Sequence, residues 1–349
     1  MDGDLGARLA ALIARGGAIP LSHYIAYANQ AYYAGRDPLG AEGDFTTAPE
    51  ISQMFGEMLG LWVADLVLRA GVADFAIAEL GPGRGTLMAD MLRAMERHAT
   101  PARVHFIENS PVLRDLQAAA VPQAIFHDDV QHLPGDLPII VIANEFFDAL
   151  PIRQLRRGEN GWREVYVRLT DDGQLAPCDG DVPMDAALPA ALRPAPVGAI
   201  VETCPAASAI ASAIADLIAR AGGSLLAIDY GYAGARIGNS FQALSRHQFA
   251  DPFVAPGSRD LTAHVDFGAL SAALEGGGLR VQGPVGQGKF LRALGLDARA
   301  NSLAHAHPPR AGALAGEAHR LTHADEMGTL FQVLAARSPA WPASEGFAA

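Results

Sequence analysis

The feature that most limits the possible folds of this chain is a change of hydrophobic rhythm at residue 75. Short apolar runs at 75–80, 104–108, 124–127 and 137–143 alternate with helical patterns at 86–98 and 111–120. A helical pattern at 206–221 and apolar runs at 224–229, 279–285 and 327–336 continue the series. Strands that alternate with helices of this length favour a parallel sheet covered on both faces. The sequence therefore predicts an α/β fold with about seven mostly parallel strands.

The segment before residue 75 has a different pattern. Apolar side chains recur at helical spacing from Ile51 to Leu66, which predicts a helix over 49–70 with Pro49 in its first turn. A second helix is predicted over 21–33, with Ser22 as its N-cap. We therefore expect residues 1–74 to form an N-terminal helical cap.

Two stretches interrupt the main α/β region, which we expect to span residues 75–337. The first, 152–198, has a hairpin pattern around 158–161 followed by residues rich in Pro, Asp and Ala. The second, 234–264, is irregular. Both are interpreted as insertions, and residues 338–349 are expected to form a flexible tail.

Charge and composition exclude several classes of protein. The chain has 26 Lys and Arg against 38 Asp and Glu, a net charge of −12, which disfavours a nucleic-acid partner. It has two cysteines and an acidic start without the pattern of a signal or transit peptide. The most apolar long stretch, 58–80, is interrupted by Asp65, Arg69 and Asp74, so membrane insertion is not expected. These features predict a cytoplasmic protein.

The sequence Glu79-Leu80-Gly81-Pro82-Gly83-Arg84-Gly85-Thr86 lies between the first predicted strand and its helix. Glycines let the backbone turn tightly and let a ligand approach, and ligands bind at this edge of a parallel sheet. The plainer alternative is a strand–helix turn that only needs glycine. The spacing differs from that of a pyrophosphate turn, and Glu79 would repel a phosphate. A ligand with positive charge, such as S-adenosylmethionine, suits the turn better; the candidate cofactor residues here are Glu79, Gly81, Pro82, Gly83, Gly85 and Thr86.

Polar side chains also follow the next three predicted strands. Glu108 ends the second strand, where an acid can accept hydrogen bonds from ribose hydroxyls. Asp128 and Asp129 follow the third strand and could meet an adenine amino group, and Asn144 follows the fourth. The alternative is that these are solvated loops that carry acids by chance. We include all four residues among the candidate cofactor ligands.

Residues 43–57, GDFTTAPEISQMFGE, resemble the leading signature of the MidA-type class I methyltransferases. Further matches lie at 79–86, 144–151, 229–231, 260–267 and 328–331, so the resemblance covers roughly residues 20–337. The chain departs from the family pattern at Ala31, where a glycine is usual, and at 239–241, where Asn-Ser-Phe replaces Asp-Thr-Leu. The eukaryotic members of this family are mitochondrial complex I assembly factors with protein-arginine methyltransferase activity.

This resemblance implies a Rossmann-like class I fold, methyl transfer from S-adenosylmethionine without a metal, and a protein client, possibly a respiratory-complex subunit. A guanidinium acceptor needs carboxylates that orient it and take its proton. Glu145 and Asp148 are the candidate catalytic residues, although an Asn-Glu-x-x-Asp segment could simply cap a helix. The candidate lid and acceptor residues are Tyr32, Tyr33, Asp44, Thr46, Thr47, Pro49 and Glu50; the tyrosines could instead pack at a helix end, and Thr47 could simply begin a helix.

Other functions remain compatible with the sequence. One is a non-catalytic assembly factor or chaperone that keeps the S-adenosylmethionine site and holds a client. Another is a methyltransferase that acts on small molecules. A nicotinamide-dependent oxidoreductase is less compatible, because the glycine spacing and Glu79 disfavour a dinucleotide phosphate. His319 and His323 are four residues apart on a predicted helix, but no further ligands complete a zinc site.

Overall fold

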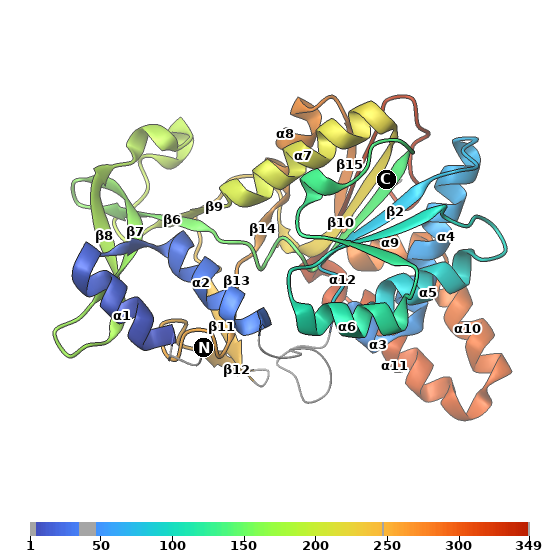
Figure 1. Ribbon diagram of the computed structural model, residues 1–349, viewed down its shortest axis with the longest axis horizontal. Coiled ribbons are helices and arrows are strands. Elements are labelled where there is room, and N and C mark those ends of the chain that lie inside the picture. The colour runs from blue at the N-terminus through green and yellow to red at the C-terminus, as the bar shows by residue number, and fades with distance from the viewer. Residues whose placement is uncertain (1–4, 35–46, 246–247, 348–349) are drawn as a thin grey trace.

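The central sheet of the protein confirms the predicted α/β fold. The computed structural model describes residues 5–34, 47–245 and 248–347. The strands of the sheet lie in the order β15-β16-β10-β5-β2-β3-β4, and β14 pairs with β10. Figure 1 labels β2, β10, β14 and β15 of this sheet. All neighbours from β10 to β4 are parallel, and β16 is antiparallel to both of its neighbours. The strands are β2 (Ala76–Leu80), β3 (Arg103–Ile107), β4 (Ala124–His127), β5 (Ile139–Asn144), β10 (Gly223–Tyr232), β14 (Val265–Asp266), β15 (Arg280–Gly286) and β16 (Phe331–Arg337).

Helices cover both faces of this sheet because its central strands are apolar on both sides. One face packs on α7 (Pro205–Ala221) and α8 (Phe267–Gly276), in a cluster that includes Ile139, Val141 and Leu225. The other face packs on α4 (Gln53–Arg69) and α5 (Thr86–Met95), in a cluster that includes Ile140 and Ile228. The helix α6 (Pro111–Ala120) contacts the edge strand β4, and the short helix η1 (Val130–His132) contacts α7.

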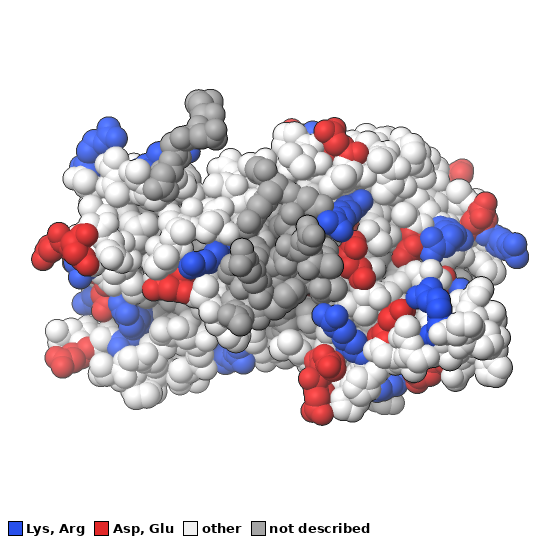
Figure 2. Space-filling model, turned by 90° about the horizontal axis from the view of Figure 1, so that it is seen from below, with Lys and Arg blue, Asp and Glu red and all other residues white. Residues whose placement is uncertain are grey.

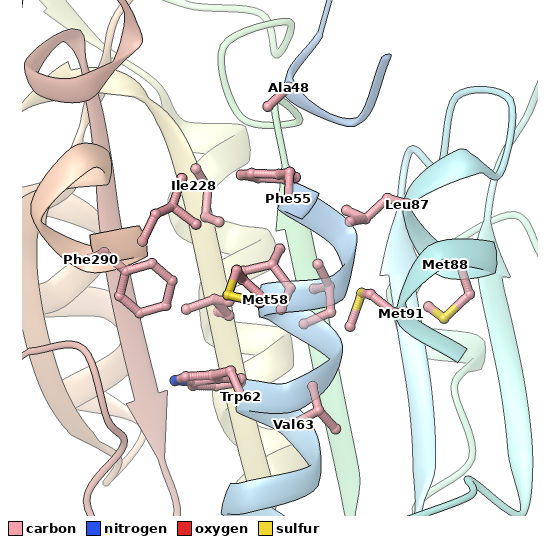
Figure 3. Close-up of a cluster of buried hydrophobic side chains, with 14 of the residues drawn as sticks. Ala48, Phe55, Met58, Trp62, Val63, Leu87, Met88, Met91, Ile228 and Phe290 are labelled. Atoms are coloured by element: carbon pink, nitrogen blue, oxygen red, sulfur yellow. The ribbon is translucent and has the colours of Figure 1, made fainter. Parts of the chain in front are cut away.

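The helix α4 belongs to the core of the main sheet. Figure 3 shows Phe55, Met58 and Trp62 of α4 among side chains of α5 and β10. Two glycines let α4 and α5 approach closely: a Cβ at Gly56 would lie 2.5 Å from Asp90 Cβ, and one at Gly60 would lie 2.6 Å from the Met91 carbonyl oxygen. This contact fixes the N-terminal ends of both helices beside the glycine turn.

The single helix predicted over 49–70 is divided at Ser52. Residues Ala48–Ile51 form the short helix α3, Ser52 has an extended backbone, and its side chain accepts a hydrogen bond from the Met54 backbone N–H at the start of α4. The serine hydroxyl also donates to Glu317 at 2.7 Å. Periodicity over the whole segment is preserved, so the sequence pattern alone did not reveal the break.

The remaining N-terminal helices pack on the two insertions. A cluster of buried side chains joins Ile13 and Tyr24 of these helices with Val167 and Leu261 of the insertions. The Tyr24 hydroxyl donates to the Pro252 carbonyl oxygen at 2.5 Å. The elements of this body are α1 (Leu5–Gly16), β1 (Ile19–Pro20), α2 (Leu21–Ala34), β6 (Arg153–Gly158), β7 (Gly161–Leu169), β8 (Leu175–Pro183), η2 (Asp185–Ala187), η3 (Ala190–Leu192), β9 (Ile200–Thr203), β11 (Gln242–Ser245), β12 (Gln248–Ala250) and β13 (Asp260–Thr262).

The C-terminal part differs from expectation in two places. Residues Met327–Leu330, expected in a strand, form the helix α12, and β16 begins at Phe331. The expected flexible tail is wrong for residues 338–347, because Trp341 is buried and Phe347 packs on Phe290. The helices that precede α12 are α9 (Gln287–Ala293), α10 (Leu296–Ala306), η4 (Pro308–Arg310) and α11 (Ala311–Thr322).

Within the described residues, every helix is too short or too polar to cross a membrane.

Candidate active site

A cavity of about 820 Å³ opens where the carboxyl ends of β2, β3, β4, β5 and β10 meet. The sequence-predicted residues that line it are Tyr33, Thr47, Pro49, Glu50, Glu79, Gly81, Pro82, Gly83, Thr86, Glu108, Asp128, Asp129, Asn144, Glu145 and Asp148. Tyr32 and Gly85 are outside the lining, and Asp44 and Thr46 lie outside the described residues. The fold thus gathers residues that are more than 100 positions apart in the chain.

The glycine turn after β2 has a backbone that favours glycine at three positions. Gly81, Gly83 and Gly85 have φ angles of +59°, +56° and +81°, in the left-handed region. Gly85 packs on the next helix, because a Cβ there would lie 3.4 Å from the Cα of Gln117. The turn is therefore held in shape by neighbouring structure, and Gly81 and Gly83 present their backbone to the cavity.

Gln117 is a site residue that the sequence analysis missed. It is fully buried, and its Nε2 donates to the Gly83 carbonyl oxygen at 2.8 Å and to Glu108 Oε2 at 3.0 Å. This side chain connects the glycine turn to the acid at the end of β3. A single uncharged residue within a helix carries no sequence signal for such a role.

Glu108 and the acids after β4 have different partners. Glu108 Oε1 accepts hydrogen bonds from the backbone N–H groups of Asn109 and Ser110, both at 2.8 Å. Asp128 pairs with Arg114 at 2.6 Å, and Asp129 Oδ1 accepts from the backbone N–H of Gln131 at the start of η1. Glu108 is thus held in one orientation toward the cavity. Asp128 is thus partly engaged by α6, and Asp129 by its own loop.

Glu79 lies on the floor of the cavity and is buried, which raises its pKa to about 8. Its Oε2 is buried without a hydrogen-bond donor among the described residues, and the same is true of Asn144 Oδ1. A buried acceptor without a donor is unfavourable, so both atoms fit a ligand that brings N–H groups or positive charge. The α-ammonium and sulfonium of S-adenosylmethionine have this chemistry.

Glu145 and Asp148 lie in the loop that follows β5. Glu145 has a φ of +49°, which is uncommon for a residue other than glycine, and its Oε1 accepts a hydrogen bond from the Ala48 backbone N–H at 3.1 Å. Burial raises the pKa of Glu145 to about 7 and that of Asp148 to about 6. At neutral pH these carboxyls can therefore both accept and release protons.

Residues of the N-terminal body complete the wall beside these carboxyls. The Tyr33 hydroxyl of α2 donates to Asp260 Oδ2 of β13 at 3.0 Å, and burial together with the charges of Asp260 and Asp148 raises its pKa well above the ordinary value. Tyr32, expected beside Tyr33 in the acceptor channel, is instead fully buried. Asn29 and Asp260, which also line the cavity, were absent from the predicted site because no local pattern connects them to it.

The segment at the start of α3 joins the two parts of the cavity. Glu50 Oε1 accepts a hydrogen bond from the Thr86 hydroxyl at 2.7 Å, while Ala48 donates to Glu145. Thr47 is the N-cap residue of α3, but its side chain makes no capping hydrogen bond. Thr47, Pro49 and Glu50 therefore form part of the cavity wall as well as the start of a helix.

The charge of the cavity is predominantly negative. Its lining includes Glu50, Glu79, Glu108, Asp128, Asp129, Glu145, Asp148 and Asp260, whereas Arg84 is the basic residue among the described lining residues. On the face shown in Figure 2, Lys and Arg side chains lie scattered among Asp and Glu side chains. Within the described residues, no cluster of three His, Cys, Asp or Glu side chains suited to a metal ion is found. The cavity is thus suited to cationic ligands.

Curated relatives and solved structures are similar to this chain over most of its length. It is 33% identical to the Drosophila melanogaster protein arginine methyltransferase NDUFAF7 homolog, over 95% of this chain and 84% of that protein. It is 36% identical to the Danio rerio protein arginine methyltransferase NDUFAF7, over 86% and 78%. A Burkholderia thailandensis crystal structure with bound S-adenosyl-homocysteine has a TM-score of 0.86 and 28% identity, and covers 98% of this chain and 93% of that one.

These comparisons correct one expectation and confirm others. Both relatives are named as mitochondrial proteins, which overturns the expected cytoplasmic location. The class I fold and S-adenosylmethionine as cofactor are confirmed. The family of S-adenosyl-L-methionine-dependent methyltransferases matches residues 58–285, and this chain belongs to that family.

Proposed function

We propose that this protein is a protein-arginine N-methyltransferase. The observation that carries the proposal is a group of carboxyls, buried Asp148 and Asp260 with half-buried Glu145, beside the cofactor end of the same cavity. Planar guanidinium groups bind carboxylates through paired hydrogen bonds. The names of the curated relatives, which are protein arginine methyltransferases, support the same acceptor.

The cofactor end of the cavity would hold S-adenosylmethionine. Glu108 would accept hydrogen bonds from the ribose hydroxyls, and Glu79 and Asn144 would face positive charge. The bound cofactor supplies a methyl group on a sulfonium, which is a good leaving group. The main task of the protein is therefore to align an acceptor nitrogen and to remove its proton.

At the acceptor end, Asp148 and Glu145 would orient the guanidinium. The acceptor nitrogen loses one proton as it is methylated, and a carboxyl whose pKa is about 7 can take that proton at neutral pH. The Ala48 N–H fixes one oxygen of Glu145, so the direction of its other oxygen is restricted. We assign Glu145 as the general base and Asp148 as the orienting carboxylate.

The client is proposed to be a subunit of a respiratory complex. The support is the name NDUFAF7 of the relatives together with the acidic cavity, which suits an arginine in a basic segment. A pulldown from a lysate with labelled methyl donor, followed by mass spectrometry, would identify the labelled protein.

The proposal is tested with purified protein, labelled S-adenosylmethionine and arginine-containing peptides. We expect methylarginine in the products and a loss of about 10²–10⁴-fold in kcat for Glu145→Gln, with cofactor affinity within about threefold of wild type. The exposed Glu159→Gln is the matched control. Cofactor binding without any methyl transfer would contradict the proposal and favour a non-catalytic assembly factor. Transfer only to small molecules would contradict the protein acceptor.

A further inference from the structure

Asp229 is a buried acid in direct contact with the loop that carries the candidate catalytic carboxyls. It lies in β10 beside β5 and is fully buried. Its Oδ2 accepts hydrogen bonds from the backbone N–H groups of Phe147 at 3.0 Å and Asp148 at 3.2 Å. Its Oδ1 accepts from the Tyr230 N–H at 2.9 Å. The function described above gives this residue no role.

The loop needs such an anchor because its backbone is unusual. Glu145 has a left-handed φ of +49°, and its N–H donates to the Ile228 carbonyl oxygen at 2.9 Å. The chain then turns so that Glu145 and Asp148, three residues apart, both line the cavity. Strained backbone of this kind persists only where surrounding contacts determine it. The contacts of Asp229 with residues 147 and 148 supply that constraint from β10, outside the cavity lining.

We propose that Asp229 is a positioning residue for methyl transfer: its carboxylate sets the turn after β5 and thereby aims Glu145 and Asp148 at the acceptor. This inference rests on the proposed function for the identity of the acceptor. It adds a residue that lies outside the cavity lining and acts through the backbone of its neighbours.

Asp229 and the same carboxyls repel one another when they are ionised. Burial, followed by the charges of Asp148 and Glu145, raises the pKa of Asp229 well above its ordinary value. Acids this close titrate as a group, so the last proton leaves at a higher pH than it would from one acid alone. The titratable groups around Asp229 and Asp148 are Glu145 in the same loop, Tyr230 of β10, Tyr33 of α2 and Asp260 of β13.

The two roles of Asp229 can be separated by two substitutions. In Asp229→Asn, the amide oxygen can still accept from the Phe147 and Asp148 N–H groups, but the titratable acid is removed and an NH₂ group faces the Tyr230 N–H. In Asp229→Ala, every acceptor is removed. We expect kcat to fall about 10-fold in the first and at least 100-fold in the second, with cofactor affinity within threefold of wild type in both.

The pH dependence of kcat distinguishes a positioning role from a merely structural one, because a structural role alone would leave that dependence unchanged. In Asp229→Asn, removal of one acid from the group should shift the acid limb of kcat to lower pH by at least half a unit. Asp266→Asn is the matched control, because Asp266 Oδ1 also accepts from three backbone N–H groups, those of Gly234, Gly268 and Ala269, but lies outside this cavity. The control should retain the wild-type kcat and pH profile.

The assay measures S-adenosylhomocysteine release with any acceptor that the wild type methylates. Wild-type activity only on acceptors without arginine would contradict the proposed function, while the comparison of the Asp229 variants on that acceptor would still decide this inference. Wild-type kcat and pH profile in Asp229→Asn would overturn it. Equal losses of kcat and cofactor affinity would also overturn it, because Asp229 would then support the whole site. If Asp229→Ala does not fold, the pH profile of Asp229→Asn alone decides.

Discussion

The two ends of the cavity, which the proposed function assigns to the cofactor and to the acceptor, are built in different ways. The cofactor end comes mostly from one continuous stretch, from Glu79 to Asp129, to which β5 adds Asn144. Within this stretch Glu108 accepts hydrogen bonds from adjacent backbone groups and from Gln117. The acceptor end combines α2, the loop after β5, β10 and β13, and partial or full burial raises the pKa values of Glu145 and Asp148 there. One end is therefore held rigidly by local contacts, and the other depends on tertiary packing.

This difference indicates that the cofactor and the acceptor are bound in different ways. A local turn of fixed shape can bind the same nucleoside regardless of the acceptor. The buried carboxyls of the acceptor end become ionised most readily when a cation enters, because a neighbouring positive charge lowers the pKa of an acid. Under the proposed function, binding of a guanidinium and readiness to accept its proton are thus linked by the same residues.

The largest effect is expected for Gly83→Val, which tests whether cofactor binding can be lost without a change at the acceptor end. Gly83 has a φ of +56°, and a β-branched residue is strongly disfavoured there. We expect S-adenosylmethionine affinity to fall at least 100-fold by calorimetry. Gly71→Val is the control, because Gly71 has a φ of +67° but lies away from the cavity. Unchanged affinity in Gly83→Val would place the cofactor elsewhere.

Glu79→Gln tests whether burial at the cofactor end carries a pH-dependent penalty. The pKa of Glu79 is about 8 in the folded protein, above its unfolded value, so its carboxyl favours the folded state most below about pH 4.5 and loses this contribution as the pH rises toward 8. From pH 4.5 to 7, urea unfolding should show the variant gaining about 3 kcal/mol relative to wild type. The exposed Glu159→Gln should show no such trend; a constant difference for Glu79→Gln would contradict the raised pKa.

The sequence predicted the cofactor end better than the acceptor end for a physical reason. Glycine turns and acids at strand ends are local signals, and Glu79, Gly83 and Glu108 all line the cavity. Contacts such as Tyr33 with Asp260, 227 positions apart, depend on how the N-terminal helices pack on the insertions. No periodicity in either segment encodes that packing.

The break at Ser52 and the packed C-terminal segment illustrate the same limit. Helical spacing of apolar residues continues across Ser52, although its backbone is extended. Residues 338–347 have the Pro, Ser and Gly content of a tail, but Trp341 is buried in the main core cluster and Phe347 packs against that cluster. Only tertiary contacts distinguish these segments from the continuous helix and the flexible tail that their composition indicates.

Gln117→Leu should weaken the cofactor end without breaking it. The substitution removes the N–H group that joins the Gly83 carbonyl oxygen to Glu108, and the lost hydrogen bonds are worth about 1–3 kcal/mol. We expect S-adenosylmethionine affinity to fall about 10-fold, with a smaller change in the acceptor KM. Leu116→Ala, on the exposed side of the same helix, is the control. A larger change in acceptor KM than in cofactor affinity would contradict the division into two ends.

The smallest effect is expected for Tyr33→Phe, which removes one hydroxyl from the acceptor end. That hydroxyl donates to Asp260 and lies near Asp148, so its loss leaves the Asp260 carboxylate less well oriented while the ring still fills its place. A neutral hydrogen-bond donor is worth about 1 kcal/mol, which corresponds to a rise of about fivefold in acceptor KM with unchanged S-adenosylmethionine affinity. Tyr27→Phe, on the exposed side of the same helix, should leave both constants unchanged. If Tyr33→Phe weakens cofactor binding as much as acceptor binding, the two ends of the cavity are coupled through α2 and cannot be treated as separate sites.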